Sequence, residues 1–296
     1  MKKLSYRQKQ DWTMNAFTIP AVILFLIFVI MPFCRGIFLS FTNWNGYSQH
    51  YKMVGLKNFL RLFTDQNVTR AVGNTLFYGI GSTVLQNIFG LLFAIFLNHK
   101  FSGRNIGRTI IYLPVMIAPL IMGYIMYFFF TLNGAINQIP FIANNPVLTD
   151  WLSDGKRAVV IITVINSWQF VGISMVIYLA GLQGIPAMYY EVAKLEGVKP
   201  KELFRYITFP LLAPALNSAV VLNLIGGLKL FDVIMALTKG GPGYDSNSLS
   251  TLVNRTYFGS ENAGYASAIG MVVFAIIVVL SFITTNALNK YQEKMS

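Results

Sequence analysis

Six long apolar stretches limit this 296-residue chain to a membrane-spanning fold. Each is long enough to cross a bilayer, whose hydrocarbon core of about 30 Å takes about 20 apolar residues in a helix. Hydrophobic residues make up 55% of the chain and charged residues only 11%, too few to cover a water-soluble domain of this size. The expected spans are Trp12–Cys34, Ala71–Leu97, Thr109–Leu132, Ala158–Leu182, Leu211–Leu237 and Gly264–Leu288. We therefore predict an all-α integral membrane protein with six transmembrane helices.

The positions of the basic residues orient the chain in the membrane. With the N-terminus inside, 13 of the 23 Lys and Arg residues fall on the cytoplasmic side, and eight fall in the longer outer loops. Because cytoplasmic loops carry an excess of Lys and Arg, both termini are predicted to be cytoplasmic. The 13 residues are Lys2, Lys3, Arg7, Lys9, Lys100, Arg104, Arg108, Lys194, Lys199, Lys201, Arg205, Lys290 and Lys294. The net charge of +12 thus reflects topology, and without a basic stripe interleaved with aromatic residues we expect no nucleic-acid partner.

The sequence lacks the residues that several kinds of chemistry require. No G-x-x-x-x-G-K-[ST] loop occurs, so no nucleotide site is expected on this chain. A single cysteine, Cys34, excludes an internal disulfide and a cysteine metal cluster. His50 and His99 lie on opposite predicted sides of the membrane and are not expected to share a metal or a catalytic centre. We therefore predict no metal site and no enzymatic activity on this chain.

A charged, helix-breaking segment separates the fourth and fifth apolar stretches. It spans residues 186–214, and its central sequence is EVAKLEGVKPKELFRYITFPLLAP. Ala187–Leu195 is predicted to be a short helix, which Gly197 can end by adopting the left-handed conformation. Pro200 suits the first turn of a second short helix. The segment is therefore expected to form a helical hairpin on the cytoplasmic side, and one interpretation is a basic amphipathic element that lies on the bilayer.

The spacing within this segment resembles the cytoplasmic coupling loop of ABC importer permeases. The family pattern is Glu-Ala-Ala, three residues, Gly, nine residues, Ile, two residues, Pro, three residues and Pro. The chain matches it at Glu191, Ala193, Gly197, Ile207, Pro210 and Pro214. It departs at Val192, where Ala is usual, and at Glu196, where Asp is usual, and both changes keep size class or charge. The resemblance implies that these residues, Glu196 included, dock an ATPase subunit.

Two further segments resemble carbohydrate-uptake permeases. Residues Phe231–Pro242, FDVIMALTKGGP, are similar to the Phe-Asp-x-Ile-x-x-Leu-Thr-x-Gly-Gly-Pro signature of that subfamily. Residues Gly55–Phe59, GLKNF, resemble a Gly-Leu-x-Asn-Phe segment that often precedes the second helix. A compatible interpretation of the second segment is an interfacial helix anchored by aromatic residues. The first segment narrows the implied substrate to sugars or related polyols.

The resemblance also implies an architecture and a set of partners. Residues 71–290 correspond to a type-I permease core of five helices that contains the coupling loop 186–214. Residues 1–70 are the cytoplasmic N-terminus, the first helix and an outer loop, and residues 291–296 are a cytoplasmic tail. The implied partners are a second permease subunit, two ATPase subunits that hold ATP and Mg²⁺, and an extracellular binding protein. The expected location is the bacterial cytoplasmic membrane, with no cofactor on this chain.

Polar residues inside the apolar stretches are candidates for the substrate path. Unpaired amides are costly in hydrocarbon, so Asn166 and Gln169 are expected to face a helix interface or a wet cavity. The same holds for Asn223, and Trp168 offers an aromatic face on which a sugar ring can stack. Equally, these polar groups can serve only to bond neighbouring helices.

Two charged residues stand in the fifth apolar stretch. Lys229 and Asp232 are three residues apart, so they are expected to share one helix face near the outer end of the span. Their side chains can contact the substrate, or they can snorkel to the membrane surface.

The most consistent function is import of a carbohydrate, in particular an oligosaccharide, driven by ATP on a separate subunit. An alternative in the same class is import of a glycerol phosphate or polyol, in which Lys229 would face a phosphate. An alternative from another class is a secondary transporter or channel that works without an ATPase.

Overall fold

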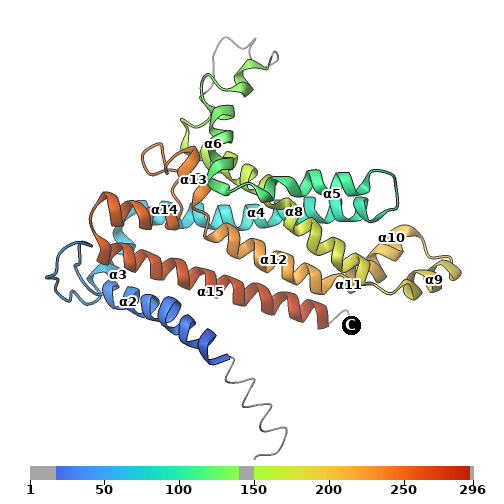
Figure 1. Cartoon of the computed structure of the whole chain (residues 1–296), viewed down its shortest axis with the longest axis horizontal. Coiled ribbons are helices and arrows are strands. Elements are labelled where there is room, and N and C mark those ends of the chain that lie inside the picture. The colour runs from blue at the N-terminus through green and yellow to red at the C-terminus, as the bar shows by residue number, and fades with distance from the viewer. Residues whose placement is uncertain (1–17, 140–149, 294–296) are drawn as a thin grey trace, which may run out of the picture.

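The protein is a bundle of long helices with shorter helices at both ends (Figure 1). The computed structural model describes residues 18–139 and 150–293. The long helices are Thr18–Ser40, which ends in α2 (Met31–Ser40), α4 (Gln66–Asn98), α8 (Gly155–Gly184), α12 (Ala213–Leu228) and α15 (Ala263–Glu293). The shorter elements are α3 (Lys57–Thr64), α5 (Arg104–Tyr112), η2 (Leu113–Met116), α6 (Pro119–Phe130), η3 (Ala135–Gln138), α9 (Ala187–Leu195), α10 (Pro200–Leu203), η4 (Phe204–Thr208), α11 (Phe209–Leu211), α13 (Asp232–Leu237), α14 (Leu249–Asn254) and η5 (Arg255–Gly259). These described ranges hold no β-strand, which confirms the predicted all-α fold for them.

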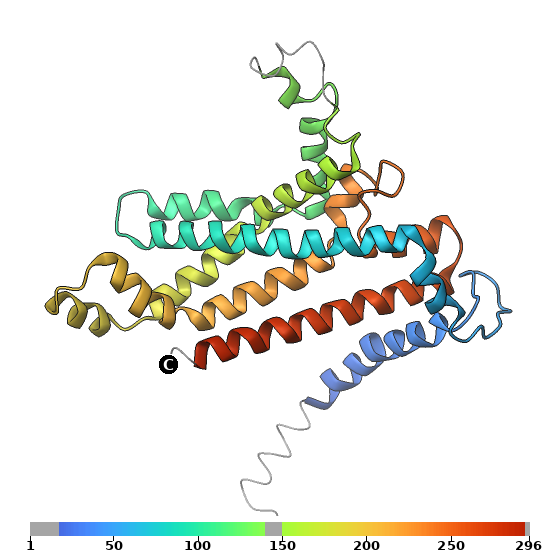
Figure 2. The ribbon, with the colours of Figure 1, turned by 180° about the vertical axis from the view of Figure 1, so that it is seen from behind.

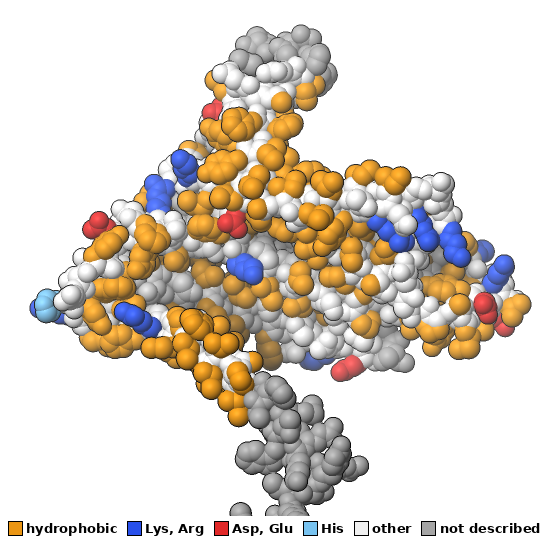
Figure 3. All heavy atoms as spheres, in the orientation of Figure 1, with side chains coloured by type: hydrophobic (Ala, Val, Ile, Leu, Met, Phe, Trp, Pro, Cys, Tyr) orange, Lys and Arg blue, Asp and Glu red, His pale blue; other side chains and the backbone are white. Residues whose placement is uncertain are grey.

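Several of these helices are suited to cross a membrane. By length and composition, five helices in the described ranges qualify, and a bent pair brings the number to six. Hydrophobic side chains cover much of the face seen in Figure 3, as expected for a surface in contact with lipid tails. The first expected span begins at Trp12, and residues 12–17 lie outside the described ranges. The count of six spans and the cytoplasmic placement of both termini stay predictions.

The third expected span, Thr109–Leu132, is wrong as a single helix. The chain forms α5 and η2, becomes extended at Ile117 and Ala118, and begins α6 at Pro119. A proline disfavours the helical conformation in the residue before it, and Ala118 accordingly has φ −55° and ψ 133°. α5 runs beside α4, whereas α6 leaves the bundle at a steep angle (Figures 1 and 2). Because of this break, α6 points in a different direction from α5.

The fifth expected span, Leu211–Leu237, is also divided. Pro200–Leu211 and Ala213–Leu228 meet at a bend of 66°. α12 then ends at Leu228, and α13 begins only at Asp232. The Ser248 hydroxyl donates a hydrogen bond of 2.7 Å to the Leu230 carbonyl, which the break leaves without a helical partner. A side chain from the next element thus stabilises a break inside an apolar stretch.

α4 packs along α8 and also contacts α12. The contact with α12 requires glycine, because a Cβ on Gly227 would lie 2.8 Å from the Cα of Gly79 and 2.9 Å from the Tyr78 carbonyl oxygen. Small residues at such crossings let helices approach closely in lipid. Because the opposing atoms belong to the backbone, they cannot move aside without shifting a whole helix.

The two ends of the bundle carry different structures. α9 and α10 protrude at one end, beyond α8 and α11, and a buried cluster that includes Leu97, Met175 and Leu212 lies behind them (Figures 1 and 2). α3 and α14 lie at the opposite end, where Leu62 and Tyr265 belong to a second buried cluster. If the hairpin is cytoplasmic, as the sequence predicts, α3 and α14 lie at the outer surface.

The adjacent glycines of α12 provide a stability test. We expect Gly227→Ala to lower the thermal unfolding midpoint, since overpacking of a filled site costs about 1–3 kcal/mol. Gly226→Ala is the matched control, because a Cβ there has no described atom within 4 Å. Both changes gain the same helix propensity, so the difference isolates the contact. Equal midpoints for the two purified variants would show that the α4–α12 crossing is not tightly packed.

Candidate functional site

A cavity of about 770 Å³ lies between α8, α12 and the break that precedes α13. Its wall brings together four of the predicted path residues from these separate elements: Asn166, Asn223, Lys229 and Asp232. Among the wall residues that were not predicted are Gln86 of α4 and Pro119 at the start of α6. Gln86 carries the same signal as Asn166, an amide within a long apolar stretch, and this signal could have identified it.

The amides of the cavity wall are held by hydroxyl groups of neighbouring helices. Asn166 Nδ2 donates to Ser82 Oγ at 3.0 Å, so α8 is bonded to α4. Asn223 Nδ2 donates to Ser174 Oγ at 2.6 Å, so α12 is bonded to α8. Both asparagines are nearly fully buried, at 3% and 4% exposure. Their positions are therefore fixed, and polar groups are held at the edge of a cavity that is otherwise mainly apolar.

Lys229 and Asp232 do not share a helix face, contrary to the sequence prediction. The spacing of three residues brings side chains together only on a continuous helix, and here α12 ends before Lys229 whereas α13 begins at Asp232. Both side chains are exposed, and the described residues show no ion pair between them. They reach the cavity wall from the two sides of the break.

Trp168 and Gln169 are not part of this cavity wall. Trp168 is half exposed, at 47%. Gln169 is fully buried, and its Nε2 donates at 3.0 Å to the carbonyl of Ile117, at the break in the third expected span. Its Oε1 has no hydrogen-bond partner among the described residues. Gln169 thus bonds to the backbone of a neighbouring segment. The sequence had left two possibilities open for these polar groups, to line the substrate path or to bond neighbouring helices.

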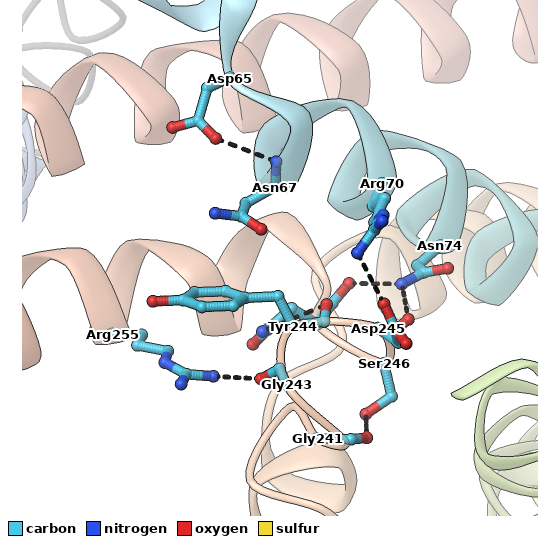
Figure 4. A network of polar contacts seen from close by, with 11 residues as sticks. Asp65, Asn67, Arg70, Asn74, Gly241, Gly243, Tyr244, Asp245, Ser246 and Arg255 are labelled. Carbon is cyan, nitrogen blue, oxygen red and sulfur yellow. Dashed lines mark hydrogen bonds and ion pairs between the residues drawn. The ribbon is translucent and has the colours of Figure 1, made fainter. Parts of the chain in front are cut away.

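The signature segment Phe231–Pro242 leads into a loop that is fastened to α4 (Figure 4). Arg70 pairs with Asp245 at 2.9 Å, and Asn74 donates to the carbonyls of Asp245 and Asn247 at 2.7 and 2.9 Å. The Tyr78 hydroxyl donates at 2.8 Å to the Ser246 carbonyl. These contacts follow one face of α4, and they hold the connection between α13 and α14 at the end of the bundle opposite the hairpin.

The same loop is held from its other side by Arg255. Its guanidinium donates at 2.6 Å to the Gly243 carbonyl and lies 3.8 Å from the centre of the Tyr244 ring (Figure 4). Gly240 has φ +83° and Gly243 has φ +58°, in the left-handed region that favours glycine. Gly240 of the signature and Gly243 just beyond it therefore have a structural reason, since they allow the tight turns of this loop.

The hairpin formed by α9 and α10 has the predicted bounds and turn. α9 spans Ala187–Leu195, as expected. Gly197 has φ +70°, and the amides of Gly197 and Val198 donate to the carbonyls of Lys194 and Ala193 at 3.2 and 3.0 Å. This pair of bonds is a Schellman motif, which satisfies the last carbonyls of α9. The turn is thus closed by backbone contacts that need glycine at its centre.

The residues of the coupling pattern divide into exposed and packed positions. Glu191, Glu196 and Gly197 are exposed, whereas Ala193 is buried at 4% exposure. Ile207 lies half buried in η4, and Pro210 and Pro214 flank the bend at Leu212. Large apolar side chains are also exposed along α9 at helical spacing. These are Met188 at 62%, Val192 at 54% and Leu195 at 87% exposure.

These features define a helical membrane protein with a cavity between its spans and a protruding hairpin at one end. Residues 86–294 match the family model of the binding-protein-dependent transport system inner membrane component, and the chain belongs to this family. It is 33% identical over 94% of both chains to a probable starch degradation products transport system permease protein of Thermoanaerobacterium thermosulfurigenes. It is 32% identical to a multiple sugar-binding transport system permease protein of Streptococcus mutans, covering 95% of this chain and 96% of that one.

The fold is also found in a solved structure. The chain superposes with a TM-score of 0.82 on a chain of a bacterial alginate ABC transporter, crystallised in complex with an alginate pentasaccharide-bound periplasmic protein. The alignment covers 98% of this chain and 99% of that chain, at 24% identity. This likeness shows the type of fold.

The loop of Figure 4 is anchored to α4 by a buried side chain, Tyr78, and by an exposed one, Arg70, and their contributions to stability can be compared. We expect Tyr78→Phe to destabilise the protein by about 1–3 kcal/mol, since the Ser246 carbonyl then loses its buried donor. Arg70→Gln should change stability by less than about 1 kcal/mol, because exposed ion pairs contribute little. Chemical unfolding of the purified variants measures both. A larger loss for Arg70→Gln would contradict this order.

Proposed function

We propose that this chain is the membrane-spanning permease subunit of an ATP-driven carbohydrate importer, and that the carbohydrate is an oligosaccharide. The observation that carries the proposal is a cavity of about 770 Å³ whose wall holds fixed amides, in a chain of the binding-protein-dependent permease family. The names of the relatives support the substrate class, since they refer to starch degradation products and to multiple sugars. The chain supplies half of the path, and a second permease subunit supplies the other half.

The proposed path runs through the cavity beside α8 and α12. Asn166 and Asn223 offer amide groups to sugar hydroxyls, and the nearby Phe170 offers an apolar surface to the C–H face of a sugar ring. Trp168 and Gln169 stay predicted members of the path, for which the structure provides no place on this cavity wall. They can act only in another arrangement of the helices or in contact with the second permease.

The hairpin of α9 and α10 is proposed to dock one of two ATPase subunits, which bind ATP and Mg²⁺. The exposed side chains of Met188, Val192 and Leu195 form an apolar stripe that would be unfavourable in water and suits a protein groove. An extracellular binding protein is proposed to deliver the sugar at the opposite end. The proposed location is the bacterial cytoplasmic membrane, and catalysis of ATP hydrolysis lies on the ATPase subunits.

Gly197 tests the proposed coupling. A side chain at a left-handed position costs roughly 1–2 kcal/mol, and Gly197→Asp also places a charge beside the apolar stripe. We expect loss of ATPase co-purification or of sugar-stimulated ATP hydrolysis, with normal membrane insertion. Gly103→Asp is the matched control, because Gly103 also has a positive φ, of +91°, and an open site with no described atom within 4 Å of a Cβ. Normal association and coupling for Gly197→Asp would refute the docking role.

The cavity residues test the proposed path. We expect Asn166→Ala and Asn223→Ala to weaken sugar uptake affinity by about 3- to 10-fold, the effect of losing one hydrogen bond. Asn217→Ala is the control on α12, the helix of Asn223. Asn217 bonds to Asn289 and Gln292 of α15 and is not part of the cavity wall. Uptake by the assembled complex in proteoliposomes measures all three. If the control and the cavity variants behave alike, the path lies elsewhere.

One observation favours a second substrate class. Lys229 lies in the cavity wall, where its ammonium group could hold a phosphate of a glycerol phosphate or the acid group of a charged polyol. Competition between a sugar and glycerol phosphate for uptake separates the two substrates. A secondary transporter would move substrate without any ATPase, so transport by the lone chain in proteoliposomes would overturn the importer proposal.

A further inference from the structure

The short helix α3 divides its surface into three distinct faces. α3 spans Lys57–Thr64 and begins within the GLKNF segment, which the proposed transport function does not use. With about 3.6 residues per turn, positions four and seven apart share one face. One face is packed on the protein, a second is apolar and exposed, and the third carries positive charge. Each face has its own observations.

The packed face fixes the orientation of α3. Asn58 Nδ2 donates to the carbonyls of Ser40 and Thr42, at 2.9 and 2.8 Å, where α2 ends. Leu62 is buried at 8% exposure in the cluster that contains Tyr265 of α15. These contacts give Asn58, the asparagine of the GLKNF segment, a structural role. They also prevent α3 from rotating to bury its other faces.

The apolar face is left uncovered by the chain itself. Leu56, Leu60 and Phe63 lie at spacings of four and three residues, with exposures of 63%, 66% and 85%. Exposure of three large apolar side chains in one row is unfavourable in water. The row therefore indicates a surface that is covered when the protein is in its working environment.

The charged face lies beside the apolar row. Lys57 and Arg61 are both exposed, and they are four residues apart on the same side of the helix. The Arg61 guanidinium lies 4.2 Å from the centre of the Tyr265 ring, which holds it in place. A row of apolar side chains flanked by cations is the pattern of a helix that lies in a membrane interface.

The position of α3 selects lipid as the covering partner. α3 follows the span that ends at Ser40, and it is separated from α4 by Asp65 alone. It therefore stays close to the membrane boundary, at the end of the bundle opposite the hairpin (Figure 1). Phe38, near the end of α2, is exposed as well, with its ring centre 6.4 Å from that of Tyr51.

We propose that α3 is seated in the outer interface of the bilayer, with Leu56, Leu60 and Phe63 among the lipid acyl chains. Lys57 and Arg61 then lie at the level of the headgroup phosphates. This inference requires only that the chain spans a membrane with the hairpin inside, and it does not depend on the transported substrate. It assigns the outer loop a role in fixing the depth at which α2 and α4 enter the membrane.

Site-directed spin labelling of the assembled importer in lipid nanodiscs tests this proposal. Because Cys34 is the only cysteine, a Cys34→Ser background lets single labels be placed by Leu60→Cys, Phe63→Cys, Lys57→Cys and Thr64→Cys. Collision with oxygen reports lipid, and collision with a water-soluble nickel chelate reports water. We expect oxygen to exceed the chelate several-fold at positions 60 and 63, and the reverse at the exposed control positions 57 and 64.

Two outcomes would overturn the proposal. Strong collision with the chelate at positions 60 and 63 would place the apolar face in water. Weak collision with both reagents would show that a protein, such as the binding protein or the second permease, covers this face. Co-purification with the partner subunits confirms that each labelled variant is assembled, and a Leu56→Cys label replaces position 63 if that variant fails to assemble. A transport defect leaves this measurement unaffected, so failure of the transport proposal remains distinguishable.

Discussion

The structure depends on one constraint, that backbone amides and carbonyls must find partners where water is absent. A continuous helix meets this requirement by itself, and a break does not. This chain breaks its apolar stretches and supplies side chains to the freed carbonyls. Gln169 donates to Ile117 and Ser248 donates to Leu230 at two breaks, and Asn58 donates to Ser40 where α2 ends. In each case the donor comes from a different element, so each of these contacts also bonds two parts of the bundle together.

Two of the breaks are located at the cavity. Pro119 follows the first break and Lys229 begins the second, and both residues form part of the cavity wall. Irregular backbone at membrane depth is tolerated where it is buried in protein or faces a wet cavity. The division of these stretches therefore has the same physical origin as the site.

The sequence predicted the elements whose causes are local. The bounds of α9 and the left-handed Gly197 follow from helix formers and a glycine that are adjacent in the chain. For Asn166 the sequence left open a helix interface or a wet cavity, and the side chain bonds to Ser82 of α4 at the edge of the cavity. The break after Leu228 could not be predicted in this way, because Lys229 and Asp232 also fit one face of a continuous helix, and the stabilising hydroxyl of Ser248 comes from 18 residues beyond Leu230. The break before Pro119 carried a signal, the proline itself, which hydropathy alone does not register.

The continuity of α8 has a mechanical consequence. Asn166 lies in its middle, and only Ile185 and Pro186 separate its last residue, Gly184, from α9. At about 1.5 Å per residue, the arm from Asn166 to the hairpin is about 28 Å long. A sideways displacement of α9 by a few ångströms therefore tilts this arm by several degrees against α4, along which α8 packs. The cavity wall turns with it, because the chain provides no hinge within α8 to absorb the motion.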